Sequence, residues 1–233
     1  MQPENPQVCP AQSDSDPVVP PGDTAPSVIL RPASWVHVLP LSDVFDPSRP
    51  LEVDVGCGKG RFLLARALRF PDHNFLGIDR LVVRLGKVDR RIVRQSLPNV
   101  RLLRMEAWYA IAHLLPPESV TCFYVFFPDP WPKRRHHGRR LFTADFLTSL
   151  HRALRDDGQV HVATDHTDYL AWIQKAFALD PRFERIEPFV PQEDERTDFE
   201  RIFSAQGLPI GRCSYRKVST SPGGSPRMLM SST

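Results

Sequence analysis

Short apolar runs alternate with longer amphipathic stretches through the middle of the chain. The runs have the length of buried strands and lie at 51–55, 74–78, 100–104, 120–127 and 159–163. Between them, apolar positions recur with helical spacing, which predicts helices at about 60–70, 80–96, 107–114, 142–155 and 167–179. Two later runs, at about 182–190 and 210–218, predict a closing pair of strands. This alternation is typical of βαβ units, so we expect an α/β fold with a mostly parallel sheet and helices on both faces.

The two ends of the chain have a different composition from its middle. Residues 1–27 are rich in Pro, Gln, Ser, Asp and Gly, and residues 219–233 are similar. Segments of this kind have too little apolar surface to offset the entropy of ordering. We therefore expect a disordered Pro-rich arm at 1–27, one folded domain at 28–218 and a disordered tail at 219–233.

Composition narrows the class of protein. A hydrophobic content of 41% supports a core, and a net charge of only +3 means that any nucleic-acid role depends on local clusters of Lys and Arg. No stretch approaches the ~20 apolar residues of a membrane span, and no signal-peptide pattern is present. We expect a soluble, cytoplasmic protein. Metal-ligand spacing is missing from the four scattered cysteines, Cys9, Cys57, Cys122 and Cys213, so we expect neither a zinc site nor disulfides.

A glycine-rich loop follows the first strand. Gly56, Gly58 and Gly60 come directly after residues 51–55 and precede the first helix. Glycines let the backbone approach a ligand closely, and the start of a helix offers free N–H donors. A dinucleotide site requires the pattern G-x-G-x-x-G, whereas the third glycine here comes one residue early and Arg61 takes its place. The loop therefore argues against a nicotinamide or flavin cofactor.

Acidic residues stand near the ends of the first three strands. Asp79 comes about twenty residues after the glycine loop, where a carboxylate can accept both hydroxyls of a ribose. Asp54 precedes the glycines and is placed to face an ammonium or sulfonium group. With Glu106 after the third strand, this set resembles the S-adenosylmethionine site of Rossmann-like methyltransferases. The alternative is structural, with Asp54 capping a turn and Glu106 standing in the first turn of the next helix.

The fourth strand ends in prolines that bracket one acid and one tryptophan, and cations follow at once. The string is Phe126-Phe-Pro-Asp-Pro-Trp-Pro-Lys-Arg-Arg-His-His-Gly-Arg-Arg140. Proline cannot donate to a sheet ladder, so the strand stops there. The density of cations beside a predicted cofactor site favours RNA contact over an ordinary surface patch, and such contact weakens as salt rises. Trp131 either packs the loop against the sheet or stacks on a base.

A second basic row follows one face of the predicted helix at 80–96. It leaves two interpretations open, a solvated helix face and a nucleic-acid contact surface. The row consists of Arg80, Arg84, Lys87, Arg91 and Arg94.

The string after the fourth strand resembles the signature of bacterial tRNA (guanine-N7)-methyltransferases, F-x-P-D-P-W-x-K-x-R-H-x-x-R-R. The likeness continues through Ala163-Thr-Asp165 and Thr197-Asp-Phe-Glu200, which resemble the family's A-T-D and T-K-F-E, and it spans about 51–211. It implies a Rossmann-like fold with a closing antiparallel strand. It also implies transfer of a methyl group from S-adenosylmethionine to guanine N7 in tRNA, at guanosine 46 of the variable loop. Apart from the resemblance, we expect no metal, and a monomer and a homodimer both stay open.

The resemblance also implies the site residues. Asp129 is the catalytic residue, and the cofactor is bound by Asp54, Gly56, Gly58, Gly60, Asp79, Glu106 and Asp129. The substrate is met by Lys133, Asp165, Thr197, Asp198, Phe199 and Glu200. RNA contact is assigned to Arg135, His136, His137, Gly138, Arg139 and Arg140. Asp198 departs from the family's Lys, and this reversal of charge puts a phosphate contact there in doubt.

Chemistry suits these residues. Guanine N7 carries a free lone pair, so alignment matters more than removal of a proton, and Asp129 can stabilise the positive charge that moves onto the ring. Asp165 or Glu200 can accept hydrogen bonds from N1–H and the 2-amino group, which selects guanine over adenine.

Two other functions compete with this one. A catalytically idle RNA-binding protein would have lost the cofactor acids or glycines, and these are present. An exocyclic-amine methyltransferase typically has Asn or Asp followed by Pro-Pro and an aromatic residue, and Asp129-Pro130-Trp131 lacks the second proline.

Overall fold

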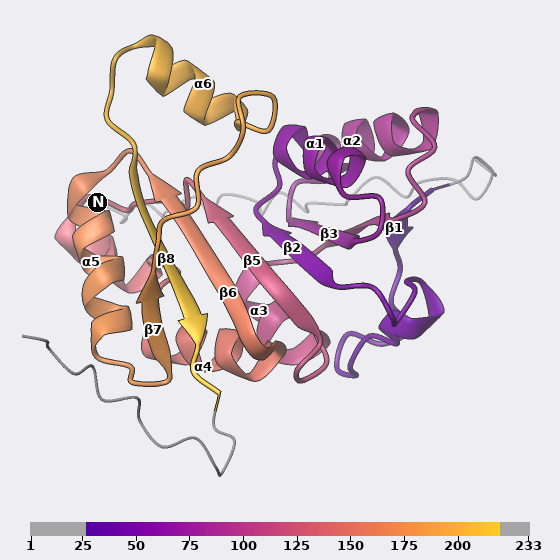
Figure 1. The fold of residues 1–233 in the computed structure, drawn as a ribbon, viewed down its shortest axis with the longest axis horizontal. Coiled ribbons are helices and arrows are strands. Elements are labelled where there is room, and N and C mark those ends of the chain that lie inside the picture. Colours follow the sequence, from indigo (N-terminus) through magenta and orange to yellow (C-terminus); the bar gives the residue numbers. More distant parts are fainter. Residues whose placement is uncertain (1–26, 220–233) are drawn as a thin grey trace, which may run out of the picture.

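One eight-stranded sheet forms the centre of the structure (Figure 1). The structure is a computed structural model, and it describes residues 27–219. The order across the sheet is β1-β4-β3-β2-β5-β6-β8-β7. Neighbouring strands from β1 to β6 run parallel, and β8 is antiparallel to both of its neighbours. This arrangement confirms the predicted fold class. The strands are β1 (Ile29–Leu30), β2 (Leu51–Val55), β3 (Asn74–Asp79), β4 (Val100–Arg104), β5 (Val120–Phe126), β6 (Leu154–Thr164), β7 (Phe183–Ile186) and β8 (Gly211–Lys217).

Helices lie on both faces of the sheet. They are α1 (Arg61–Arg69), α2 (Val82–Arg94), α3 (Ala107–Tyr109) with a π-helical turn after it (Ala110–Leu114), α4 (Ala144–Ala153), α5 (Thr167–Ala178) and α6 (Asp198–Ala205). Two 3₁₀ turns, η1 (Leu41–Asp43) and η3 (Arg134–Arg139), complete the set within the described residues. None of the helices in this part of the chain is long and apolar enough to cross a membrane. Residues 1–26 and 220–233, which hold nearly all of the predicted arm and tail, lie outside the described residues.

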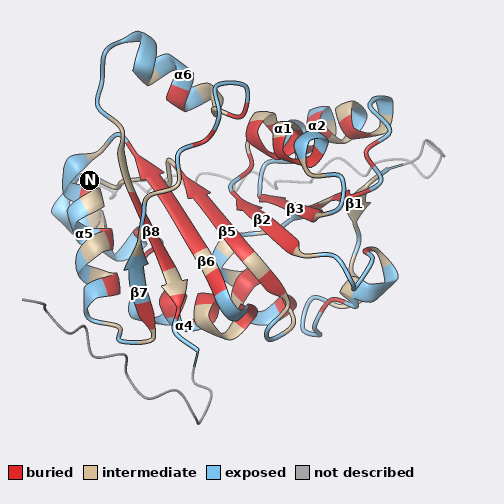
Figure 2. Ribbon diagram, in the orientation of Figure 1, coloured by how far each residue is buried: buried red, intermediate tan, exposed pale blue. Residues whose placement is uncertain are grey.

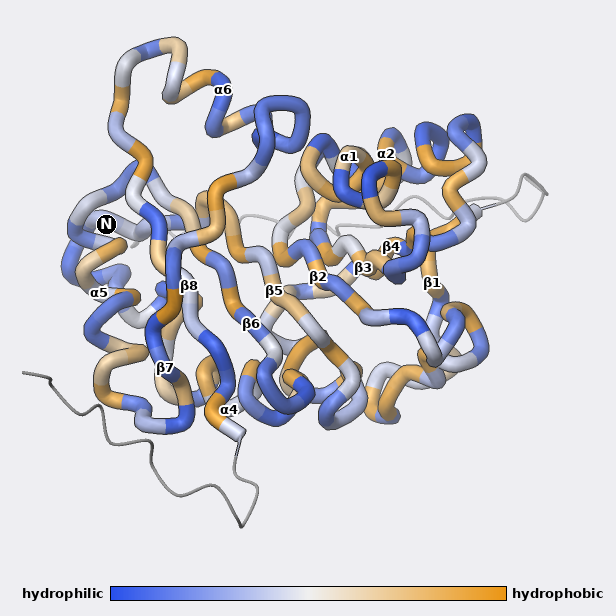
Figure 3. The backbone as a smooth tube through the Cα atoms, viewed as in Figure 1, coloured by the Kyte–Doolittle hydropathy of each residue, from blue (hydrophilic) through white to orange (hydrophobic). Residues whose placement is uncertain are grey.

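Two apolar layers hold the helices on the sheet. On one face, α1 and α2 insert Leu63, Leu85 and Val88 against the strands, and each of these side chains is buried. On the other face, the π-helical turn, α4 and α5 insert Ile111, Phe146 and Ile173 in the same way. Figure 2 shows the result, with buried strands and exposed outer helix faces. Figure 3 shows the matching hydropathy, with apolar segments along the central strands.

The observed elements differ from the predicted ones mainly in the second half of the chain. Strand β6 begins at Leu154 and not at 159, because a bulge interrupts its pairing with β5 and lets the strand start earlier. Asp157 sits in this bulge with φ 59°. Helix α6 was not predicted, although Thr197-x-x-Glu200 followed by apolar residues is a capping-box signal.

The segment before α6 is fastened to α1, and this contact fixes where α6 lies. Glu195 is 1% exposed and accepts from Arg66 at 3.4 Å and from Arg69 at 2.9 Å. The Arg61 side chain donates to the carbonyl of Arg196 at 3.0 Å. Helix α1 begins at the glycine loop. The contacts with α1 therefore fix the position of α6 relative to that loop. In Figure 1, α6 lies beyond the carboxyl ends of β5 and β6.

Candidate active site

The carboxyl ends of five adjacent parallel strands carry most of the predicted site residues. In sheet order, the strands β4, β3, β2, β5 and β6 run side by side in one direction (Figure 1). Their carboxyl ends therefore meet at one edge, which is where ligands bind in sheets of this type. Along this edge lie, in the same order, Glu106, Asp79, Asp54 with the glycine loop, Asp129 and Asp165.

All three glycines of the loop between β2 and α1 adopt positive φ. The values are 78° at Gly56, 54° at Gly58 and 68° at Gly60. The loop is tied to β3, since the N–H groups of Gly56 and Cys57 both donate to the carbonyl of Ile78, at 2.8 and 3.0 Å. The backbone at this edge is thus fixed in a conformation that other residues rarely adopt, with little side-chain bulk in the way of a ligand.

The packing around Gly60 also requires a residue without a side chain. A Cβ atom at this position would lie 2.6 Å from Cγ1 of Val88, which is fully buried in α2. We expect Gly60→Ala to lower the free energy of unfolding by about 2–4 kcal/mol, from positive-φ strain plus overpacking. Gly86→Ala is the control, because its Cβ would meet nothing within 4 Å. Urea unfolding of both variants checks this, and equal stabilities would contradict it.

Asp79 connects the end of β3 to its surroundings. It is 8% exposed, and its two carboxylate oxygens accept from the N–H of Gly58 at 3.0 Å and the N–H of Leu81 at 2.8 Å. Each oxygen keeps acceptor capacity for a further donor, such as a ribose hydroxyl. Asp79 therefore both shapes the glycine loop and remains able to bind a ligand.

Asp54 is a buried acid without a partner. It is 6% exposed, and no hydrogen bond or ion pair to its side chain is found among residues 27–219. Burial, and then the charge of Asp79, raise the pKa of Asp54 to about 7. The predicted alternative, a turn-capping role, is not what the contacts show. A cationic ligand group would compensate this carboxylate, so the residue fits a positively charged cofactor.

Glu106 has a structural role at the start of α3, one position before the first turn in which the alternative placed it. It is the N-cap of α3, and its two oxygens accept from the N–H of Trp108 at 3.1 Å and of Tyr109 at 2.8 Å. The side chain is exposed, so each oxygen can still accept from a ligand. Capping and ligand binding are compatible at this position.

The loop after β5 holds Asp129 between two strained residues. Phe127 has φ 53° and Trp131 has φ 44°, both in the region that non-glycine residues avoid. The Phe127 N–H donates to the carbonyl of Ala163 at 2.7 Å, which fixes the loop on the end of β6. Trp131 packs within the loop, edge-on to His136 and with the Arg139 guanidinium 5.0 Å from its ring centroid. Asp129 itself is exposed at the edge of the sheet.

Arg140 departs from the expected RNA contact. It is 4% exposed, donates to the carbonyl of Pro130 at 2.9 Å, and lies about 5 Å from the ring centroids of Tyr169 and Trp172. Its guanidinium anchors the loop on α5 and is not available to a phosphate. Lys133, Arg135, Gly138 and Arg139 are exposed, whereas His136 and His137 are half-buried.

Helix α6 brings the predicted substrate residues over the site in different ways. Thr197 caps the helix by accepting from the N–H of Glu200 at 3.1 Å. Asp198 pairs with Lys59 of the glycine loop at 3.7 Å. Phe199 is 52% exposed and its ring centroid lies 6.1 Å from that of Phe127. These contacts place α6 against both the glycine loop and the Asp129 loop.

Glu200 is buried and held by a residue that sequence patterns did not single out. It is 2% exposed, and its Oε1 accepts from Arg212 of β8. Burial raises the pKa of Glu200, and Arg212 opposes that shift. Its Oε2 is buried and has no hydrogen-bond partner in the described part of the chain. No sequence pattern indicates the contact of Arg212 with Glu200 or the contact of Phe127 with Phe199. The ring contact and the ion pair each join segments that are far apart in the chain.

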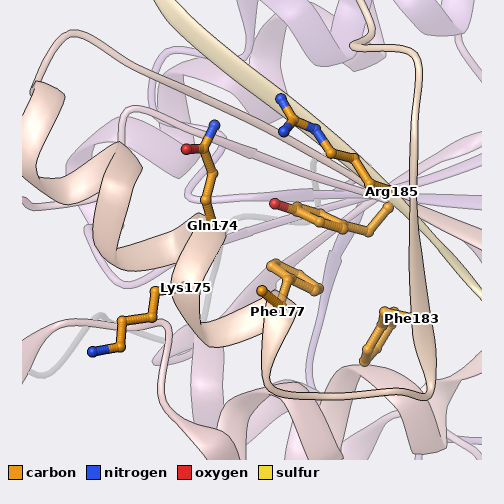
Figure 4. A pocket seen from close by; sticks show the side chains of 7 residues that line it. Gln174, Lys175, Phe177, Phe183 and Arg185 are labelled. Atoms are coloured by element: carbon orange, nitrogen blue, oxygen red, sulfur yellow. The ribbon is translucent and has the colours of Figure 1, made fainter.

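Two hollows lie away from this edge. One, of about 370 Å³, is lined by Gln174, Lys175, Phe177, Phe183 and Arg185 among others, between α5 and β7 (Figure 4). The other, of about 270 Å³, lies over β5 and β6 beside Arg66 and Phe189. Neither contains a predicted site residue. Within residues 27–219, no group of three or more His, Cys, Asp or Glu is arranged to hold a metal, and Cys57, Cys122 and Cys213 are free and buried.

Comparison with known proteins gives consistent results. The family model "Putative methyltransferase" matches residues 48–212. A tRNA (guanine-N(7)-)-methyltransferase of Chlorobium phaeobacteroides is 37% identical over 158 residues, which cover 68% of this chain and 76% of that protein. One from Thermotoga maritima is 33% identical over 192 residues, which cover 81% of this chain and 61% of that protein. The antibiotic-resistance methyltransferase Kmr has a TM-score of 0.56 at 17% identity, covering 78% of this chain and 92% of that chain.

The fold and the site together define a Rossmann-like methyltransferase, a class whose methyl donor is S-adenosylmethionine. More narrowly, the chain belongs to the tRNA (guanine-N7)-methyltransferase family, as the length and identity of the matches show.

Proposed function

We propose that this protein transfers a methyl group from S-adenosylmethionine to N7 of guanine in tRNA, and that the target is guanosine 46 of the variable loop. The observation that carries the proposal is that two acids stand at the ends of adjacent strands, one buried and without a hydrogen-bond partner and the other exposed. Asp54 stands at the end of β2 and Asp129 follows β5. The relatives named for this activity support it. The protein acts in the cytoplasm, as a monomer or a homodimer.

Four acids and the glycine loop form the cofactor site. Bound S-adenosylmethionine supplies a methyl group on a positively charged sulfur. Asp54 provides a negative charge without another partner, and Asp79 and Glu106 keep acceptor capacity beyond the backbone N–H groups that they already bind. Gly56, Gly58 and Gly60 let the backbone come close to the ligand. Asp129 faces the same edge from the neighbouring strand.

The guanine is held by residues of α6 and of the strand ends. The Oε2 atom of Glu200 is a buried acceptor without a donor among residues 27–219, and it suits guanine N1–H or the 2-amino group. Arg212 keeps that carboxylate in place. Asp165, exposed after β6, is a second acceptor. Phe199 offers an exposed ring beside Phe127 on which a base can stack.

The RNA backbone is held by the exposed cations after Pro132. Lys133, Arg135 and Arg139 project from η3 and the residue before it, next to the Asp129 loop. Asp198 does not serve as a phosphate contact, because its charge is negative and is paired with Lys59. Its replacement of the family's Lys therefore gives α6 a contact with the glycine loop in place of one with RNA.

Methylation of unmodified tRNA tests the proposal. The full chain is incubated with S-adenosylmethionine and a tRNA transcript, and the modified nucleotide is mapped by its sensitivity to reduction and cleavage at N7-methylguanosine. We expect one modified guanosine, at position 46, and none in a transcript with adenosine there. Methyl groups on an exocyclic amine would contradict the reaction, and tRNA binding without any methyl transfer would favour an idle RNA-binding protein.

A further inference from the structure

The outer face of α2 carries positive charge that nothing in the described protein neutralises. Arg84, Lys87, Arg90 and Arg94 are exposed, and within residues 27–219 none of them takes part in an ion pair. The helix has one acid, Asp89, whose carboxylate accepts from the N–H of Val28 at 2.7 Å. The face defined by these four cations, here called the α2 surface, is therefore a dense and uncompensated positive patch.

Several cations of α1 and of β8 differ from those of α2, because carboxylates of other segments pair with them. Arg66 and Arg69 of α1 hold carboxylates at 3.1 and 2.7 Å, and Arg212 of β8 holds Glu200. A helix face that only needed to be soluble would be expected to mix both charge signs or to have its cations paired from neighbouring segments, as in α1 and β8. The concentration of unpaired cations on α2 thus indicates a polyanionic partner.

The position of α2 brings this patch close to the active-site edge. Helix α2 follows β3 and η3 follows β5, and only β2 lies between these strands. With neighbouring strands about 4.8 Å apart, the ends of β3 and β5 are separated by roughly 10 Å. The helix cannot move away easily, because Val88 packs against Gly60 at the end of the glycine loop. Helix α2 and η3 therefore follow strands on either side of β2, the strand that leads into the glycine loop.

We infer that the α2 surface binds phosphates of the same tRNA whose guanine enters the site, so that the RNA is held on both sides of the cofactor. This inference rests on the proposed function. Phosphate contacts of this kind set the position and affinity of the RNA and do not read its sequence. They act on tRNA binding alone, since within residues 27–219 none of the four side chains forms a hydrogen bond or ion pair with a residue of the cofactor or guanine site.

The test compares two triple variants that remove the same charge. Arg84→Gln/Lys87→Gln/Arg94→Gln removes three cations of the α2 surface. Arg155→Gln/Lys175→Gln/Arg185→Gln removes three exposed cations from the start of β6, from α5 and from β7, all away from the active-site edge. The dissociation constant for tRNA is measured from 50 to 200 mM KCl, together with KM for tRNA, kcat and the affinity for S-adenosylmethionine.

We expect the α2 variant to bind tRNA at least tenfold more weakly at low salt and the control to be within about twofold of the parent. The slope of log affinity against log salt should fall by about 2–3 in the α2 variant, since each lost phosphate contact removes about 0.7–0.9. Its KM should rise, with kcat and cofactor affinity unchanged. Equal salt slopes for the two variants would overturn the inference. If the parent binds tRNA but methylates none, the proposed reaction is wrong. The comparison of salt slopes still tests whether the α2 surface binds phosphates of the tRNA.

Discussion

Asp129→Asn is expected to lower kcat by on the order of 100-fold while the affinities for S-adenosylmethionine and tRNA stay within a few-fold of the parent. The side chain is exposed, so the change removes a charge and disturbs no packing. Positive charge develops on the guanine ring as N7 is methylated, and a fixed carboxylate at that place stabilises it more in the transition state than in the bound substrates. The loss therefore falls on kcat. Single-turnover rates at saturating cofactor and tRNA measure it.

Asp72→Asn is the matched control, because Asp72 is also exposed and precedes β3 at the opposite edge of the sheet. It should keep the parent's rate. An Asp129→Asn protein that turns over as fast as this control would remove Asp129 from the catalytic role. A variant with a normal rate constant but a raised KM would make it a substrate-binding residue only.

The sequence predicts the edge of this site well because of the topology of parallel sheets. Once the runs at 51–55, 74–78 and 120–127 are recognised as parallel strands, their ends must meet, and Asp54, Asp79 and Asp129 come together without further information. The same argument places Asp165. Local pattern and one rule about sheets are sufficient for this part of the structure.

The parts that escaped prediction depend on contacts between distant segments. The run at 133–140 shows that cations are dense, but only the packing of α5 shows that Arg140 turns inward to Tyr169 and Trp172. Likewise, the contact of Arg212 with Glu200 joins β8 to α6, and neither residue carries a local signal for the other. Such pairs are set by where two elements happen to pack, which spacing along the chain does not encode.

The charged form of Asp54 has opposite effects on two measurable quantities. It lowers the stability of the ligand-free protein, and it favours binding of a cationic cofactor. Its pKa in the folded, ligand-free protein is about 7, because burial and the neighbouring Asp79 disfavour the charged form. An acid whose folded pKa lies above its unfolded value contributes stability that is greatest below the unfolded pKa and is lost as pH rises through the folded one. The ligand-free protein should thus lose stability through this group as pH rises from about 4 to about 7. A cationic cofactor should reverse the preference by favouring the charged carboxylate.

Asp54→Asn should therefore make the ligand-free protein more stable relative to the parent at pH 8 than at pH 5, by roughly 2–3 kcal/mol, because the neutral amide does not ionise. The comparison between pH values cancels any constant cost of burying the amide. The same variant should bind S-adenosylmethionine about 100-fold more weakly, since the buried charge that matches the cation is gone. The parent's affinity should rise about tenfold between pH 6 and pH 8, as Asp54 becomes charged, and the variant's should not. Urea unfolding and calorimetric titration measure the two effects, and a variant that is neither relatively stabilised at pH 8 nor impaired in cofactor binding would show that Asp54 is an ordinary buried acid.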